Sequence, residues 1–262
     1  MIESNSALLQ LFDKSPLKQR KWREISALLP ALSGMRCLDI GSDNGVISLL
    51  LRKLGGDWSS ADLVPETVEA IRAVVGDNVE QIDGQRMPYS DSSFDLVIIV
   101  DFLEHIESDR QFIGELSRIM KPGSVLVVNV PNPRSGPLRW FRSLIGQTDA
   151  AHGHLRPGYS LSQLTELLAP HFIIEQQHAY SRFFSELADT LITAALDLLK
   201  RFSGAKKRGT KGTVVTGADM QRMGVSFKIY SMIYPLMSLM VRMDGCLFWM
   251  RGSMLIVKAK RL

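Results

Sequence analysis

The sequence predicts an α/β protein built on a doubly wound, mostly parallel sheet, and three observations lead to this prediction. Short apolar runs alternate with helical patterns over residues 36–130, the order that parallel strands joined by right-handed crossovers require. Residues 96–100 form a continuous apolar run, typical of a strand buried on both faces. A glycine-containing turn at 41–45 joins the first strand to a helix, and such a junction directs free backbone amides at a bound ligand.

Each element has a local signal. Apolar residues at helical or strand spacing mark the elements, and turn residues bound them. Pro16 is expected to break the first helix, Pro122 and Gly123 to end a later one, and Ser160 to cap another. Helices are expected at 6–32 in two pieces, 45–54, 65–75, 111–120, 139–145 and 161–168, and strands at 36–40, 57–61, 79–82, 94–100, 124–130, 172–180 and 254–259.

Composition and charge narrow the class of protein. With 262 residues, 45% of them apolar, the chain can bury one sizeable core. Its two cysteines, Cys37 and Cys246, lack metal-ligand spacing, and no secretory signal is visible, so a cytoplasmic location is expected. Residues 1–170 carry 21 acidic and 17 basic side chains, whereas 171–262 carry 6 acidic and 14 basic ones. The basic surplus therefore belongs to the C-terminal third.

Two motifs carry a family resemblance. The turn Asp39-x-Gly41-x-Asp43-x-Gly45 resembles the D-x-G-x-G-x-G loop of class I S-adenosylmethionine-dependent methyltransferases, with Asp43 in place of the middle glycine. Residues 88–97, P-x-x-D-x-S-F-D-x-V, resemble the ubiquinone/menaquinone-biosynthesis (methyltransferase type 11) branch of that family. A dinucleotide G-x-G-x-x-G fingerprint fits less well, because Asp43 and Val46 stand where it needs glycines.

The resemblance covers about 60% of the chain and implies a fold and a cofactor. The fold is a Rossmann-like, seven-stranded sheet with N-terminal helices, in which the last strand is antiparallel and lies between the fifth and sixth. The cofactor is S-adenosylmethionine, which leaves as S-adenosylhomocysteine. The implied cofactor-binding residues are Asp39, Gly41, Ser42, Gly45, Asp62, Leu63, Asp83, Gly84, Asp101 and Phe102.

The acidic residues in this set have stated roles and alternatives. A carboxylate at Asp39 favours an amine-bearing ligand over a pyrophosphate. Asp62 follows the second strand about 20 residues beyond the glycine turn, where an acidic residue meets ribose hydroxyls. By resemblance, Asp83 accepts from the adenine amino group. The alternatives are a helix N-cap for Asp62 and an Asx-turn for Asp83.

Methyl transfer requires alignment in a cavity of low dielectric constant and at most one proton acceptor. His105, just past the central strand, is the predicted catalytic residue, and the alternative is a helix-start histidine bonded to backbone. Glu104 is expected to be solvated or to serve as a helix N-terminal charge. No metal site is expected, because a His152 and His154 pair lacks a third ligand.

A second polar cluster precedes the sixth strand. His154, Arg156 and Tyr159 lie in a loop that in related enzymes closes over the acceptor, so they are predicted to contact substrate. The alternative is a loop pinned by its own hydrogen bonds.

About 70 residues separate the sixth and seventh strands. Two apolar stretches flank a segment, 200–211, that holds six bases and no acid. A helical hairpin packed on the core is one interpretation. The other is a surface lying in a bilayer interface, with the basic segment attracted to anionic headgroups. Pro235 argues against a membrane span, and nucleic acid is disfavoured because no nucleic-acid-binding motif accompanies the basic residues.

The predicted organisation has three parts. Residues 1–33 form a helical lid, 34–180 with 252–262 form a methyltransferase domain, and 181–251 form a helical insert facing membrane or substrate. The predicted activity is methyl transfer to oxygen or carbon of a small or lipid-like acceptor, with peripheral attachment at the inner face of the membrane. A non-catalytic cofactor-binding protein that works through its insert, and a dinucleotide-dependent oxidoreductase, are the alternatives.

Overall fold

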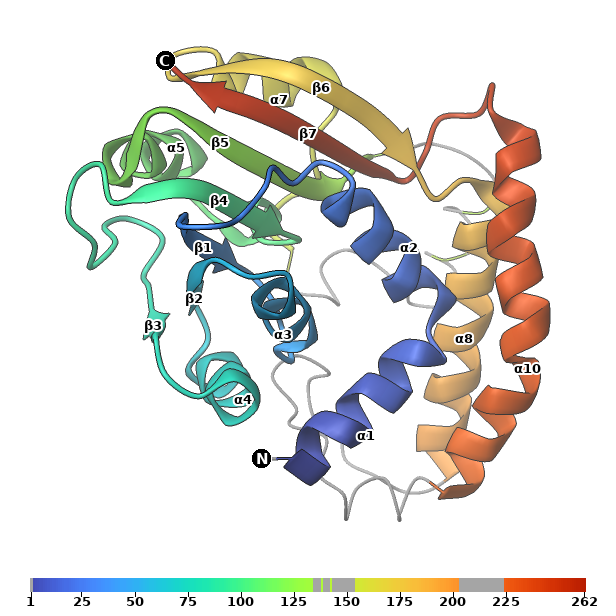
Figure 1. Ribbon diagram of the computed structural model, residues 1–262. Coiled ribbons are helices and arrows are strands. Elements are labelled where there is room, and N and C mark those ends of the chain that lie inside the picture. The colour runs from blue at the N-terminus through green and yellow to red at the C-terminus, as the bar shows by residue number, and fades with distance from the viewer. Residues whose placement is uncertain (1, 134–137, 139–141, 143–153, 203–223) are drawn as a thin grey trace.

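A computed structural model describes residues 2–133, 138, 142, 154–202 and 224–262. Seven strands form one sheet in the order β3-β2-β1-β4-β5-β7-β6 (Figure 1). The strands are β1 Arg36–Ile40, β2 Asp57–Asp62, β3 Val79–Gln81, β4 Phe94–Val100, β5 Met120–Pro131, β6 Phe172–Tyr180 and β7 Met254–Arg261. Strands β1 to β5 pair in parallel, and β7 is antiparallel to both β5 and β6. The predicted fold class, including the inserted last strand, is confirmed.

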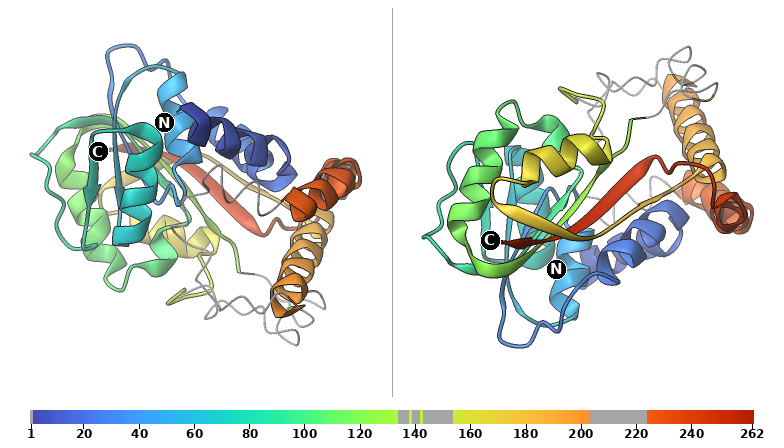
Figure 2. Two further views of the ribbon diagram at one scale, coloured as in Figure 1. Left: turned by 90° about the horizontal axis from the view of Figure 1, so that it is seen from below. Right: turned by 90° about the horizontal axis from the view of Figure 1, so that it is seen from above.

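Helices cover both faces of the sheet (Figures 1 and 2). Along the central strand β4, Leu96 and Ile98 join one apolar core while Val97 and Ile99 join another, because successive side chains point to opposite faces. The first core includes α1, α2 and α3, and the second includes α5 and α7. The helices of this layered part are α1 Ile2–Asp13, α2 Pro16–Ser26, α3 Val46–Lys53, α4 Pro65–Val75, α5 Asp109–Ile119 and α7 Leu161–Leu168.

Most element boundaries follow the local signals. Pro16 is the first residue of α2, and Ser160 forms a capping box with Gln163 at the start of α7. The segment at Pro122 and Gly123 differs from the expectation, because β5 begins at Met120 and includes both residues. The expected helix at 139–145 lies almost entirely outside the described residues.

Two long helices, α8 Phe183–Phe202 and α10 Gly224–Met243, lie between β6 and β7 in the sequence. They pack side by side at one end of the molecule, next to α1 and α2 (Figures 1 and 2). A short 3-10 helix η3, Asp244–Leu247, follows α10, and the buried Asp244 carboxylate accepts from the backbone N–H groups of Arg182 (2.6 Å) and Phe184 (2.9 Å). Asp244 therefore ties the end of the insert to its beginning. Most of the basic segment 200–211 lies outside the described residues.

No helix among the described residues combines the length and the apolarity that crossing a membrane would need.

Candidate active site

A cavity of about 490 Å³, here called the strand-end cavity, opens at the carboxyl ends of β1, β2 and β4. Doubly wound sheets bind their ligands at this edge. Its lining contains four acidic side chains and two imidazoles, so it suits a ligand that carries positive charge. The lining residues are Gly41, Asp43, Asp62, Leu63, Val64, Thr67, Asp101, Phe102, Glu104, His105, Pro131, His154 and Met254.

The glycine turn is shaped by close packing as well as by its backbone angles. Gly41 has φ +86°, and a Cβ there would lie 2.3 Å from the carbonyl oxygen of Val100. Gly45 has φ +78°, and its Cβ would lie 3.1 Å from Ile71 Cα in α4. Asp43, at the position of the missing glycine, keeps a left-handed φ of +55°, which aspartate adopts more readily than most residues. Gly41 lines the strand-end cavity, whereas Gly45 packs against α4 and does not.

The Asp39 side chain is held by hydrogen bonds within the fold, and its ligand contact stays a prediction. Its side chain is 1% exposed, and it accepts hydrogen bonds from Ser48 Oγ (2.5 Å) and Ser60 Oγ (2.8 Å), with Arg52 Nη1 3.5 Å away. Burial raises the pKa of Asp39, and Arg52 and the serine hydroxyls oppose that rise. The carboxylate joins β1 to α3 and β2, and it does not line the cavity.

Ser42 is also turned inward. Its buried Oγ accepts from the backbone N–H of Ser48 at 3.0 Å, in the first turns of α3. The Ser42 side chain is therefore held within the turn, and the cofactor contact of Ser42 stays a prediction.

Asp62 and Leu63 occupy the predicted place at the end of β2. Both line the strand-end cavity, and Asp62 is 8% exposed. Asp62 Oδ1 also accepts from the backbone N–H of Val64 at 3.3 Å, just before α4. The N-cap residue of α4 is Val64, so Asp62 precedes the cap and keeps its place on the cavity wall.

Asp83 and Gly84 are not part of the cavity lining. The exposed Asp83 carboxylate accepts from the backbone N–H groups of Gln85 (2.8 Å) and Arg86 (3.0 Å), and these bonds hold its pKa below the usual value. This is the Asx-turn alternative. The adenine contact of Asp83 stays a prediction. A Cβ at Gly84 would lie 2.8 Å from Ile106 Cδ1.

Asp101 connects the end of β4 to the N-terminal helices. It has a left-handed φ of +47°, lines the cavity beside Phe102, and accepts from Asn129 Nδ2 at 2.9 Å. Its other oxygen contacts Lys21 Nζ of α2. Burial lowers the pKa of Lys21, but three neighbouring carboxylates, Asp101 foremost, outweigh burial, so the pKa is raised. A charged lysine therefore holds α2 against the site.

Glu104, His105 and His154 come together at one wall of the cavity. Glu104 and His105 belong to the 3-10 helix η1, Leu103–His105, which follows β4. The rings of His105 and His154 lie edge to face with centroids 4.8 Å apart. Glu104 is fully buried, so the expectation that it would be solvated is wrong. Sequence spacing does not reveal this trio, because 49 residues separate the two histidines. His152 lies outside the described residues.

Arg156 and Tyr159 fasten the loop that carries His154. Arg156 contacts the Asp109 carboxylate and donates to the carbonyl of Ile106 at 2.8 Å, and Tyr159 OH donates to Asp109 Oδ2 at 2.8 Å. Neither lines the strand-end cavity. These contacts match the alternative, a loop pinned by its own hydrogen bonds, and the substrate contact of Arg156 and Tyr159 stays a prediction.

A second, larger cavity of about 590 Å³, here called the helix cavity, lies between α1, α2 and α8. Met254 at the start of β7 lines both cavities, and Asn44 of the glycine turn lines the helix cavity next to Asp43 of the other. The two spaces therefore adjoin. This cavity was not predicted from the sequence. Its apolar lining residues are Leu8, Leu11, Phe12, Leu17, Val46, Ile192 and Met254.

Comparison with known sequences agrees with the motifs. Residues 38–128 match the family model described as a methyltransferase domain. The ubiquinone biosynthesis O-methyltransferase of Xanthomonas campestris pv. campestris (strain B100) is 28% identical over 176 residues, 64% of this chain and 65% of that protein. The chain thus spans slightly less than two thirds of the length of this curated relative.

Comparison with solved structures agrees with the fold. An S-adenosylmethionine-dependent methyltransferase from Mesorhizobium loti superposes with a TM-score of 0.57 at 17% identity, over 92% of this chain and 97% of that one. The [4+2]-cyclase SpnF superposes with a TM-score of 0.55 at 18% identity, over 93% and 81%. The comparisons confirm the resemblance of this chain to the class I S-adenosylmethionine-dependent methyltransferases, and they imply S-adenosylmethionine as its cofactor.

Proposed function

We propose that this chain transfers a methyl group from S-adenosylmethionine to an oxygen or carbon atom of a lipid-like acceptor. The observation that carries the proposal is the pair of adjoining cavities, one acidic at the strand ends and one apolar between helices. The relatives named ubiquinone biosynthesis O-methyltransferase support oxygen as the methylated atom.

The strand-end cavity fits the cofactor. Asp62 can accept from ribose hydroxyls, Gly41 lines the cavity, and the acidic lining favours a ligand with sulfonium and ammonium charges. The cofactor supplies an electrophilic methyl group. Within this arrangement His105, on the cavity wall next to Asp101 and Phe102, is the proposed proton acceptor for an acceptor hydroxyl.

The helix cavity fits the acceptor. Its lining is mainly apolar, and it meets the strand-end cavity at Met254. The pair Lys21 and Asp101 lies at this boundary, because Lys21 lines the helix cavity and Asp101 lines the other. An acceptor with an apolar body in the helix cavity would therefore present its reactive end to the methyl group, with α1 and α2 as the lid.

A cavity-filling variant tests this assignment. The protein is incubated with methyl-labelled S-adenosylmethionine and either a detergent-solubilised lipid extract or an aqueous metabolite extract. We expect label in the product from the lipid extract. Ile192→Trp, which fills the helix cavity, should slow that transfer by about tenfold or more while S-adenosylhomocysteine binds as before.

Leu191→Trp is the matched control, because Leu191 is the neighbouring residue on α8 and is 55% exposed. It should transfer label at the normal rate. Label found only with the aqueous extract, or an unchanged rate in Ile192→Trp, would contradict the lipid assignment. Binding of S-adenosylhomocysteine with no transfer to either extract would favour the non-catalytic alternative.

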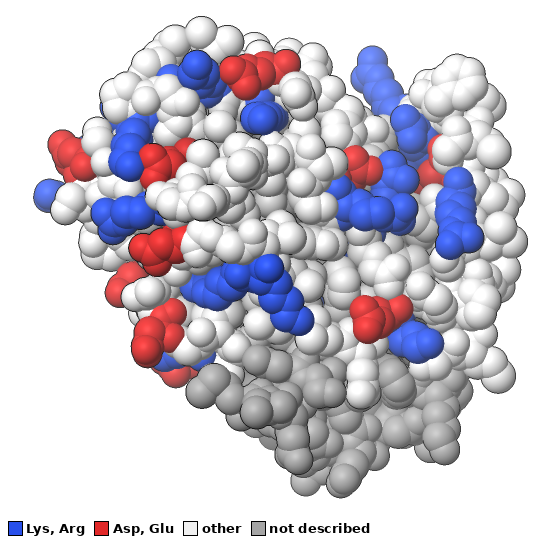
Figure 3. Space-filling model, in the orientation of Figure 1, with Lys and Arg blue, Asp and Glu red and all other residues white. Residues whose placement is uncertain are grey.

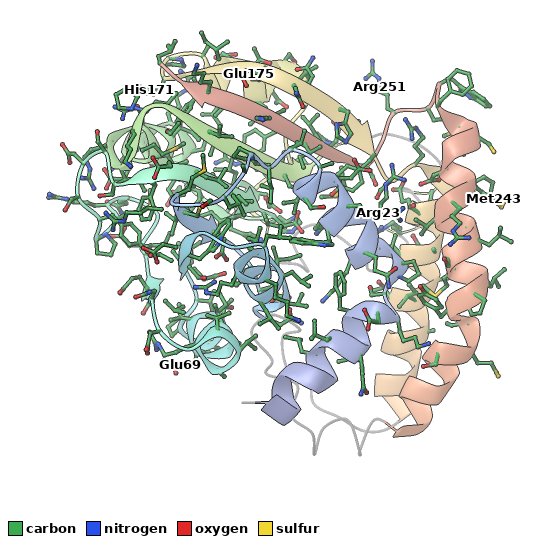
Figure 4. All side chains as sticks on the ribbon, in the orientation of Figure 1. Arg23, Glu69, His171, Glu175, Met243 and Arg251 are labelled. Carbon is green, nitrogen blue, oxygen red and sulfur yellow. The ribbon has the colours of Figure 1, made fainter. Side chains whose placement is uncertain are left out.

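Peripheral membrane attachment remains part of the proposal. Four apolar side chains on one face of α10 are 39% to 77% exposed: Met232, Leu236, Leu239 and Met243. The neighbouring Phe248 and Trp249 are also exposed. In Figure 3, the right-hand edge of the molecule, where α10 lies, is mostly uncharged surface. Figure 4 shows Met243 on the outer side of α10. Such a face suits a bilayer interface.

Vesicle binding tests the attachment. Cosedimentation with phosphatidylglycerol vesicles is expected for the native chain and should fall by about tenfold or more in Met232→Glu with Leu236→Glu, because two apolar anchors are lost. Ile173→Glu, at a residue of β6 that is 58% exposed, is the control and should bind normally. Neutralisation of Lys206, Lys207, Arg208 and Lys211, or high salt, tests the basic segment. Binding that survives all of these changes contradicts the proposal.

A further inference from the structure

We infer that Glu104, His105 and His154 bind a divalent transition-metal ion, such as Zn²⁺ or Mn²⁺, at the wall of the strand-end cavity. This inference rests on the proposed function and adds a metal that activates the acceptor. Each of the three residues offers one ligand atom, and these atoms all lie within 4.8 Å of one another. Two imidazoles and one carboxylate form a ligand set that Zn²⁺ and other divalent transition metals take in catalytic sites with an open position.

The distances are compatible with a shared ion. Ligand atoms about 2.1 Å from a tetrahedral ion lie about 3.4 Å from one another. The trio is within about 1.5 Å of that spacing, a change that side-chain rotation supplies. Glu104 is fully buried and already interacts with the charged Lys21, so an ion between the three residues would share the Glu104 carboxylate with that lysine.

The loop and helix that carry the ligands are locked to each other. The backbone N–H of Leu155 donates to the carbonyl of Glu104 at 3.0 Å, so a hydrogen bond joins the ligand-bearing segments directly. Arg156 adds hydrogen bonds to the carbonyls of Ile106 (2.8 Å) and Glu107 (3.0 Å). These contacts fix His154 opposite η1, as outer contacts orient ligands in metal sites. They also account for the absence of Arg156 from the lining of the strand-end cavity.

The position of the ion in the cavity would let it take part in the reaction. All three ligand residues line the same space as Asp62 and Asp101, so an open coordination position would face the acceptor. An acceptor hydroxyl bound there loses its proton to water more easily, because the ion stabilises the oxyanion. The oxyanion then forms the O–CH₃ bond as the S–CH₃ bond breaks, and the electron pair of that bond stays on sulfur. The charge of the metal ion does not change. With the ion bound, His105 is one of its ligands, and water, not His105, accepts the proton.

Metal titration tests the inference directly. The full chain, freed of metal with a chelator, is titrated with Zn²⁺ by calorimetry and with Co²⁺ by its visible absorption. One equivalent is expected to bind. Glu104→Gln and His154→Ala should each weaken Zn²⁺ binding by at least about 100-fold, since even outer-contact changes cost 10- to 100-fold. Thermal unfolding of each variant shows whether it is folded.

His171→Ala is the control, because His171 directly precedes β6 (Figure 4) and does not line the strand-end cavity. It should bind Zn²⁺ normally. Absence of one-to-one binding in the native chain, or unchanged affinity in folded Glu104→Gln and His154→Ala, would overturn the inference. The same samples are titrated with S-adenosylhomocysteine. If S-adenosylhomocysteine binds and Zn²⁺ does not, the metal inference is wrong and the proposed function stands. If Zn²⁺ binds and S-adenosylhomocysteine does not, the metal site is present and the proposed function is wrong.

Discussion

Replacement of Asp62 by alanine is expected to weaken S-adenosylhomocysteine binding by about 100-fold. The carboxylate lies at the end of β2 on the cavity wall, where it can accept from two ribose hydroxyls. Hydrogen bonds to a charged group contribute about 1.5 to 3 kcal/mol each, and 100-fold corresponds to about 2.8 kcal/mol. Isothermal titration of the native and variant chains with S-adenosylhomocysteine measures the change.

Asp83→Ala is the informative comparison for this prediction. Asp83 is the second acidic residue that the family resemblance assigns to the nucleoside, yet its carboxylate accepts from its own turn at Gln85 and Arg86. The structure therefore predicts less than about threefold weaker binding for Asp83→Ala. An equal loss in both variants would restore the sequence-based role of Asp83. A loss in Asp83→Ala alone would remove Asp62 from the binding site.

Replacement of Gly41 by alanine should lower the free energy of unfolding by about 3 kcal/mol and abolish measurable cofactor binding. A left-handed φ costs an alanine about 1 to 2 kcal/mol, and overpacking typically adds about 1 to 3 kcal/mol. The new Cβ would lie 2.3 Å from the Val100 carbonyl oxygen and 2.9 Å from Phe102 Cβ, so the end of β4 must move. That end carries Asp101 and Phe102 of the cavity wall. Chemical denaturation measures the loss of stability, and calorimetry measures the loss of cofactor binding.

Gly34→Ala separates strain from close packing. Gly34 has a similar φ of +74°, but a Cβ there would meet no atom within 4 Å. Only the cost of the left-handed backbone, about 1 to 2 kcal/mol, is then expected, with cofactor binding intact. If the two variants lose the same stability and both bind the cofactor, the close approach of Gly41 to β4 is not important to the site.

The fold was largely accessible from the sequence because its signals are local and periodic. The apolar run at 96–100 has no polar residue to place on a solvent face, so it required a central strand. Proline and serine signals placed the starts of α2 and α7 correctly. The start of β5 was misplaced, because Pro122 and Gly123 are compatible with a strand end as well as with a turn.

The site was accessible only in part. Positions at strand ends, such as Asp62, Asp101 and His105, follow from topology, and the structure brings them together. The spacing of residues in the sequence does not predict which groups a carboxylate binds. The Asp39 carboxylate accepts hydrogen bonds from Ser48 and Ser60. The remaining cavity residues, Val64, Thr67, Pro131 and Met254, carry no chemical signal of their own. Met254 is distant in sequence, and only the insertion of β7 beside β5 brings it to the site.

A structure with S-adenosylhomocysteine bound tests the central claim most directly. Density for the nucleoside is expected in the strand-end cavity, with the ribose hydroxyls on Asp62, the methionine part passing Gly41, and the sulfur facing the boundary with the helix cavity at Met254. Density for the nucleoside elsewhere on the molecule, or a ribose turned away from Asp62, would contradict it.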